Sequence, residues 1–312
     1  MKFWSNIRAR INQGSNLVLL YVLHSEGSSP GRQGFKMAVD DNGWMLGSIG
    51  GGFMEHKLVE LARAKLQNGH FTPFAKRQIH RTNEIKDRSG MICSGEQIIA
   101  FYFLDSSQIK NIPDENNSDT FLLLDQHGLT MQNNAEQEIQ FSLNYESEEN
   151  WQMTELLNFH PKIVIVGAGH VGLALSKLMK DLGFDVVIID DRQKLNTMEM
   201  NNYASKKVVT DYQSIDQHIP FGNIYLSVMS FGYRTDKLII TKLLDKEFKY
   251  FGVLGSKAKM KKLFEELISE GYDSERLKKI HTPIGLDIKS KTPMEIAVSI
   301  AAQIIKVKNQ YS

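Results

Sequence analysis

The sequence predicts an α/β protein in two parts, an N-terminal α+β domain and a C-terminal Rossmann-like domain with a doubly wound parallel sheet. Three observations predict it. Strands alternate with helices over residues 161–312, short alternating strands and helical segments share residues 1–104, and each part has a glycine-rich loop that opens a helix. The length of 312 residues suits roughly two domains of ~100–200 residues.

The N-terminal domain is expected over residues 1–104. Residues 1–14 have helical apolar spacing, and the apolar run at residues 17–23 favours a buried strand. The turn at Asp41–Gly43 indicates a β-hairpin. The later elements are expected to be a helix from Met54 to Asn68 and strands at about 71–80 and 96–104.

Residues 105–160 are polar and irregular, and we expect a variable β insertion plus linker with short strands at 120–125 and 138–143. The βαβ pattern begins at Pro161. Later strands are expected at 207–210, 223–230 and 250–256, and helices at 234–246 and 256–271. Thr292 and Glu295 predict a capping box at the last helix.

Composition and charge exclude several classes of protein. With 37 basic and 36 acidic residues, the net charge of +1 provides no field that would gather nucleic acid or an anionic membrane. The single cysteine, Cys93, excludes an internal disulfide and fits a reducing compartment. The run at residues 17–23 is too short for a membrane span and has no cleavage pattern after it. We expect a cytoplasmic protein.

The pattern GAGHVG at residues 167–172 follows an apolar strand, opens a helix and precedes the acids Asp190 and Asp191, as in dinucleotide-binding loops. Phosphate binding there would use the helix N-terminus, although such a loop also persists in folds that hold no nucleotide. His170 either contacts a ligand or is only solvated. The glycines would provide the tight turn, the approach to phosphate and the close helix packing, in the order Gly167, Gly169 and Gly172.

The pattern GSIGGGFMEH at residues 47–56 is a second glycine loop, without the lysine of a P-loop. It is either a ligand-binding loop or a tight packed turn, and Glu55 suits the helix dipole in both cases. Near Ser256, GVLGSKAKMKK indicates either an anion site or a helix cap with a solvated basic face. Cys93 is either a small core residue or a reactive thiol able to bind a soft metal.

Seven segments together resemble the XdhC/CoxI family, the xanthine dehydrogenase accessory factors that handle molybdenum cofactor. They occur in family order: EGSSPGRQGFKM, GSIGGGFMEHKLVELA, MICSGEQ, IVIVGAGHVGLAL, VVIIDDR, YFGVLGSKAKMKKL and IHTPIGLDIKSKTPMEIAVSIAAQII. The chain departs from the family pattern at Ser94, where a glycine is usual, at Gly31, where an arginine is frequent, and at MSFGYRTD, where the family often has histidines.

The resemblance implies a two-domain chaperone, usually a homodimer, that binds the molybdopterin form of the cofactor. A partner cysteine desulfurase would install the sulfido ligand, and an apo molybdenum hydroxylase of the xanthine dehydrogenase type would receive the product. On this analogy the cofactor-handling residues of the N-terminal domain are Gly50, Gly51, Gly52, Glu55 and Cys93, with Cys93 as the metal ligand. The Rossmann site would consist of Gly167, Gly169, His170, Gly172, Asp190, Asp191 and Arg192.

Two other functions stay open from the sequence. An NAD(P)-dependent oxidoreductase would use GAGHVG for the dinucleotide, with Asp190 or Asp191 accepting the ribose hydroxyls and favouring NAD. No proton-relay residue at a known spacing accompanies that loop. A nucleotide-gated regulatory or structural protein is the third possibility.

Overall fold

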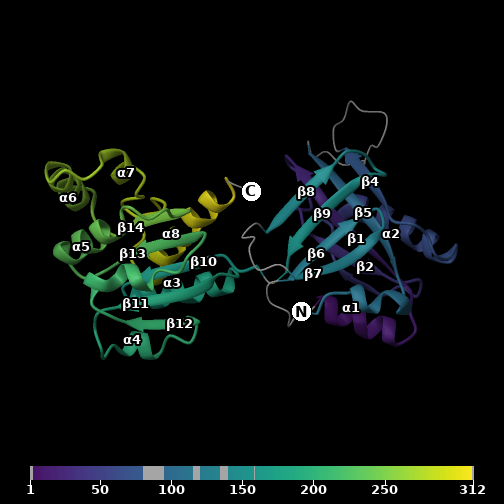
Figure 1. Ribbon diagram of the computed structural model, residues 1–312, viewed down its shortest axis with the longest axis horizontal. Helices are drawn as coiled ribbons and strands as arrows, with labels where there is room; N and C mark the ends of the chain where they lie inside the picture. The colour runs from purple at the N-terminus through teal and green to yellow at the C-terminus, as the bar shows by residue number, and fades with distance from the viewer. Residues whose placement is uncertain (1–2, 80–94, 115–119, 134–139, 158, 311–312) are drawn as a thin grey trace. The chain divides into compact units, whose positions relative to one another are not determined.

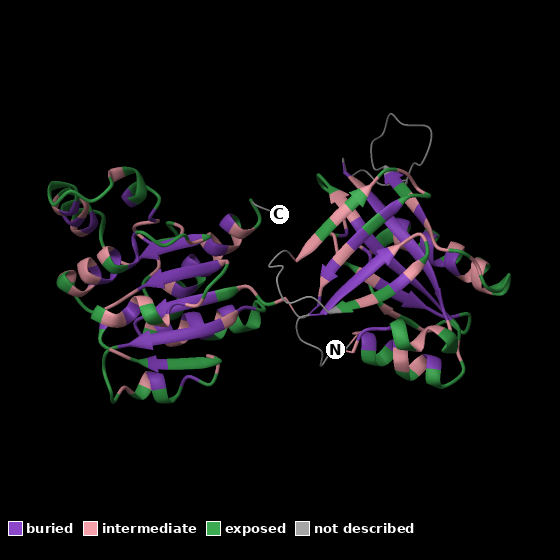
Figure 2. Ribbon diagram, in the orientation of Figure 1, coloured by how far each residue is buried: buried purple, intermediate pink, exposed green. Residues whose placement is uncertain are grey.

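The computed structural model describes residues 3–79, 95–114, 120–133, 140–157 and 159–310 of the chain (Figure 1). The chain divides into two compact units, Met1–Phe159 and His160–Ser312. Each unit has a hydrophobic core of its own, formed by the buried faces of its strands and helices (Figure 2).

The N-terminal unit contains a five-stranded antiparallel sheet. Its strand order is β3-β2-β1-β5-β4, with all pairs antiparallel. Because successive side chains of a strand point to opposite faces, the sheet forms two cores, one facing helix α2 and one facing helix α1 and a second sheet. The elements are α1 (Phe3–Asn12), β1 (Leu17–Glu26), β2 (Lys36–Val39), β3 (Met45–Gly47), α2 (Gly52–Gln67), β4 (Phe74–Ile79) and β5 (Glu96–Leu104).

A four-stranded antiparallel sheet of order β7-β6-β9-β8 completes this unit. The sequence indicated two of these strands, and the structure adds β7 and β9. Buried residues of the second sheet, such as Trp151 and Met153, share one core with β1, β5 and α1. The elements are the 3₁₀ helix η1 (Ser106–Asn111), β6 (Thr120–Asp125), β7 (Gly128–Asn133), β8 (Phe141–Tyr145) and β9 (Trp151–Leu156).

A buried polar network also joins the two sheets. Glu155 of β9 accepts a 2.5 Å hydrogen bond from the Tyr21 hydroxyl of β1 and ion-pairs with the Lys36 ammonium of β2 at 2.9 Å. The ammonium lies over the rings of Trp4 and Tyr21, at 5.4 and 5.1 Å from their centroids. The network fixes β9 against the first sheet with a charge that is compensated on the spot.

The C-terminal unit is the doubly wound parallel sheet that the sequence predicts, which confirms the fold class. Its strand order is β12-β11-β10-β13-β14. Helices α3 and α8 pack on one face, and α5, α6 and α7 pack on the other. The strands are β10 (Lys162–Val166), β11 (Asp185–Asp190), β12 (Lys206–Val209), β13 (Ile224–Val228) and β14 (Tyr250–Val253). The helices are α3 (His170–Asp181), α4 (Asn196–Glu199), η2 (Tyr212–His218), α5 (Tyr233–Leu243), α6 (Lys257–Ser269), α7 (Ser274–Lys278) and α8 (Pro293–Lys308).

The helix caps expected from the sequence are present in this unit. Thr292 and Glu295 form the capping box of α8, and the Ser256 hydroxyl caps α6 by accepting from the Lys259 amide. Ser256 therefore acts as a helix cap, the structural alternative for that segment. None of the helices in the described part of the chain has the length and hydropathy needed to cross a membrane.

Candidate functional site

Three loops of the N-terminal unit meet at one end of its first sheet. They are residues 28–31, residues 47–52 and residues 95–97. Gly31 lies so close to the Ile49 carbonyl that any side chain there would overlap it. A Cβ on Gly95 would lie 2.6 Å from the Ser29 amide nitrogen, and Gln97 Nε2 donates to the Ile49 carbonyl at 3.1 Å. Motifs from three separate parts of the sequence therefore form one surface.

The central loop requires glycine for its backbone conformation. Gly50, Gly51 and Gly52 have φ angles of +130°, +76° and +69°, which L side chains rarely adopt. A Cβ on Gly50 would also lie 2.5 Å from the Gly31 nitrogen, whereas one on Gly51 would meet no atom within 4 Å. Gly50 is needed for packing, and Gly51 leaves open space above the loop.

Glu55 binds the backbone of the same loop. Its Oε2 accepts hydrogen bonds from the amides of Ile49 and Gly51, both at 2.9 Å, and from the Ser48 hydroxyl at 2.7 Å. Burial alone would raise the pKa of Glu55, but these hydrogen bonds outweigh it and hold that pKa below its usual value. The loop thus presents converging donors that hold an anion, and here the anion is its own carboxylate.

The N-terminus of α2 adds further donors and an exposed aromatic ring. Its N-cap, Gly51, has no side chain with which to cap the helix, so the amides of the first turn have no intrahelical partner. Phe53 is 55% exposed, and the Lys57 ammonium lies 4.6 Å from its ring centroid. These groups provide amide donors, a positive charge and a planar apolar surface, which together suit an anionic ligand with a flat ring.

Cys93 lies outside the described residues. The structure begins again at Gly95, which packs against Glu26, Ser28 and Ser29 of the loop surface. The role of Cys93 as a soft metal ligand stays a prediction.

The Rossmann loop of the C-terminal unit has the close packing that its glycines imply. Gly167 has a φ of +111° and lies against the carbonyl of Met229, which follows β13. Gly172 of α3 contacts the Gly167 carbonyl, so helix and loop approach as expected. Gly169 meets nothing within 4 Å and leaves the helix N-terminus open, and His170 is exposed at the first position of α3.

The two acids after β11 have different environments. Asp190 is fully buried, accepts from the Ala168 amide at 2.7 Å and pairs with Arg192 through Nε and Nη2, both at 2.8 Å. Burial alone would raise the pKa of Asp190, but Arg192 and the Ala168 amide outweigh it and keep the pKa low. Asp191 is exposed. Of the pair, Asp191 is the one placed to meet a ligand, while Asp190 fixes the loop.

A buried polar cluster near the same sheet edge was not anticipated from the sequence. Asp236 of α5 is fully buried, accepts from the Ser230 hydroxyl at 2.5 Å and ion-pairs with Lys259 of α6 at 2.6 Å. Burial raises the pKa of Asp236, and both partners oppose the rise. Asp236 in the first turn of a helix opened by Gly232 was the available signal. Lys259 is therefore engaged in an ion pair.

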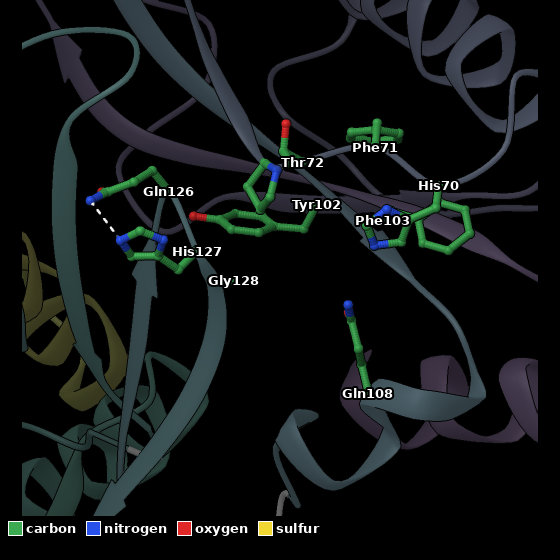
Figure 3. Close-up of a pocket in the computed structure, with 10 residues that line it drawn as sticks. His70, Phe71, Thr72, Tyr102, Phe103, Gln108, Gln126, His127 and Gly128 are labelled. Carbon is green, nitrogen blue, oxygen red and sulfur yellow. Dashed lines mark hydrogen bonds between the residues drawn. The ribbon is translucent and has the colours of Figure 1, made fainter.

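A small cavity of about 190 Å³ lies elsewhere in the N-terminal unit (Figure 3). Tyr102 and Phe103 of β5, the segment after α2 and the β6–β7 turn form its walls. His127 of the turn lies 3.3 Å from the Gln126 amide, and burial raises the pKa of Tyr102. The cavity shares no residue with the glycine loops, so it does not belong to the surface formed by the three loops.

Comparisons with known proteins place both units. A sequence model of the XdhC Rossmann domain matches residues 163–304, and a model of the XdhC and CoxI family matches residues 10–76. The chain is 23% identical over 299 residues to the uncharacterized protein YqeB of Escherichia coli K12, covering 95% of this chain and 44% of that protein. It is 28% identical over 151 residues to a Bacillus subtilis 168 protein named as a probable subunit of xanthine dehydrogenase, covering 48% and 44%.

The chain thus spans less than half of the length of either relative. A Bacillus halodurans protein, whose crystal structure is described as that of a xanthine dehydrogenase, matches with a TM-score of 0.65 at 20% identity, covering 100% of this chain and 97% of that one. At this identity the likeness shows a common fold. Since the two sequence models match one unit each, in the order that the motifs predict, the chain belongs to the XdhC/CoxI family.

Proposed function

We propose that the protein is a molybdenum cofactor binding and insertion factor, which holds the molybdopterin form of the cofactor for a molybdenum hydroxylase of the xanthine dehydrogenase type. Family membership and the name of the Bacillus subtilis relative support the link to that system. The observation that carries the proposal is the loop surface at residues 28–31, 47–52 and 95–97, where the open N-terminus of α2 meets an exposed aromatic ring.

The chemistry of this surface fits the ligand. A phosphate tail would bind the first-turn amides of α2, where the helix dipole also favours negative charge. A flat pterin ring would pack on Phe53, with Lys57 next to it. Cys93 would supply a soft sulfur ligand to molybdenum. Gly95, two residues after Cys93 in the chain, packs on the same surface.

Binding and delivery need no bond-making step by this chain, so the proposed activity is that of a chaperone. The proposed partners are an apo molybdenum hydroxylase, a cysteine desulfurase that supplies sulfur to the cofactor, and a second copy of this chain. The Rossmann loop at Gly167 to Gly172 would hold a nucleotide or a phosphate of the cofactor.

Anaerobic purification followed by assay of bound molybdopterin and molybdenum tests the proposal. We expect the wild-type protein to retain both and Cys93→Ala to retain less molybdenum. Gly51→Ala places a methyl group in the open space above the loop and should weaken binding of the pterin. Gly43→Ala is the matched control, because its φ of +90° and open surroundings match those of Gly51 in a hairpin turn away from the loop. Absence of cofactor from the wild-type protein, or equal retention by both glycine variants, would contradict the proposal.

The competing function is an NAD(P)-dependent oxidoreductase. It would depend on Gly169 for phosphate binding and on Asp191 for the ribose hydroxyls, because Asp190 is engaged by Arg192 and the loop amide. Titration with NADH, followed by nicotinamide fluorescence, distinguishes the two functions. Saturable binding that Gly169→Asp abolishes, together with turnover of a substrate, would favour the oxidoreductase.

A further inference from the structure

One end of the β1–β5 strand pair has a histidine and two carboxylates on a single face. Glu26 of β1 lies directly opposite Glu96 of β5 in the antiparallel register, and His24 lies opposite Ile98. One donor atom from each of His24, Glu26 and Glu96 lies within 4.8 Å of the other two. Among the described residues, no other group of three histidine, cysteine or acidic side chains has this spacing.

A β-bulge brings these side chains together. The register of β1 shifts between Val22 and His24, so Leu23 is the extra residue. Val22 faces the core under α2, and strict alternation would place His24 and Glu26 on that same face. The bulge transfers them to the opposite face, where their partners on β5 are Ile98 and Glu96. Bulges are enriched next to functional sites because they re-aim side chains in this way.

The charges around the group favour a cation. Two carboxylates directly opposite each other repel, and only Glu96 has a basic partner in the described part of the chain, Arg77 at 2.6 Å. Glu148 lies on the same side, since its Oε1 accepts from the Arg77 amide at 3.0 Å. The neighbouring Tyr145 has a raised pKa, first through burial and then through the charges of Glu148, Glu149 and Glu96, with Arg77 opposing. The site therefore keeps an excess of negative charge.

We propose that His24, Glu26 and Glu96 bind one divalent transition-metal ion of the Zn²⁺ type. An imidazole nitrogen with carboxylate oxygens suits Zn²⁺ and its neighbours in the first-row series, whereas Mg²⁺ and Ca²⁺ prefer oxygen ligands alone. Three protein ligands leave a coordination position for water or for a ligand, as in zinc sites that do chemistry. The site is distinct from the molybdenum of the proposed cargo and requires no cargo to form.

Isothermal titration of the full, tag-free chain with Zn²⁺ tests the site. Every protein carries Cys93→Ser, so that the only thiol does not bind zinc. His24→Ala and Glu26→Gln remove a ligand each without touching the Arg77–Glu96 pair, and His127→Ala removes an exposed histidine of the β6–β7 turn as a matched control. Far-UV circular dichroism checks that each variant is folded.

We expect one Zn²⁺ per chain for the parent and for His127→Ala. Each ligand variant should lose at least the ~10–100-fold in affinity that substitutions around metal sites produce. Mg²⁺ at the same concentration should not compete. Absence of saturable Zn²⁺ binding by the parent, or unchanged affinity in His24→Ala and Glu26→Gln, would overturn the proposal. Because the proteins are titrated without molybdopterin, either result leaves the proposed cargo function to its own test.

Discussion

Replacing Asp190 by alanine tests whether this carboxylate fixes the Rossmann loop. The side chain is 0% exposed, and its loss leaves the buried Ala168 amide without an acceptor, which costs about 1–3 kcal/mol. The Arg192 side chain is 47% exposed, so its ion pair adds only ~0–1 kcal/mol. The free energy of unfolding of the C-terminal unit should fall by about 2–4 kcal/mol. Asp191→Ala, at an exposed position, should change it by less than ~0.5 kcal/mol.

The two units can be followed separately in one thermal unfolding experiment. All three tryptophans, Trp4, Trp44 and Trp151, lie in the N-terminal unit, so tryptophan fluorescence reports on that unit alone. Far-UV circular dichroism reports on both. For a unit of this size, the expected loss lowers the C-terminal midpoint by about 4–16 °C. The fluorescence transition should stay in place as the internal control.

The pH dependence gives a second test of the same carboxylate. The pKa of Asp190 is lower in the folded protein than the value near ~3.9 of an unfolded chain, so its stabilisation is complete above that value and is lost as the pH falls through the folded pKa. The difference between wild type and Asp190→Ala should be equal at about pH 7 and pH 5 and should narrow below about pH 4. Equal midpoints for Asp190→Ala and Asp191→Ala at about pH 7 would refute the assignment.

Two further predictions concern the N-terminal unit. Glu155→Ala leaves the buried Tyr21 hydroxyl and the Lys36 ammonium without their shared acceptor, and should lower the free energy of unfolding by about 3 kcal/mol in urea titrations followed by tryptophan fluorescence; an effect no larger than that of exposed Glu149→Ala would contradict this. Glu55→Gln should weaken the pH dependence of the unfolding midpoint, because the wild-type carboxylate stabilises the fold above its unfolded pKa and loses that effect as the pH falls through its lowered folded pKa. Parallel midpoint curves for wild type and Glu55→Gln between about pH 6 and pH 3 would show that the loop gains nothing from the charge.

Local patterns in the sequence were sufficient for the C-terminal unit. Apolar runs alternating with amphipathic helices predict the parallel sheet, and the capping box at Thr292 and Glu295 is present where the sequence places it. These signals depend on neighbours within a few residues, which is why a single sequence contains them. The strand β9 (Trp151–Leu156) was not anticipated, although its burial alternates regularly, because polar residues fill its exposed positions and its partners are distant in the chain.

Partners of functional side chains were harder to predict. The sequence places Glu55 in a first helical turn and Asp190 at the end of a strand, and both positions are correct. It does not show that each carboxylate turns back to bind amides of its own glycine loop, because that depends on the rotamer and on the backbone path of the loop. Likewise, His24 and Glu96 are 72 positions apart in the printed sequence, and only strand register together with the bulge brings them together.

Glu55 makes the first glycine loop selective by size. Its carboxylate is covalently tethered next to the amides of Ile49 and Gly51, and such a tether corresponds to an effective concentration of about millimolar or more. A small anion such as inorganic phosphate has to compete with this acid for the same donors and gains nothing else. A larger ligand that also packs on Phe53 and reaches the open first turn of α2 gains further free energy and can displace it. The loop thus rejects simple anions and admits extended ones.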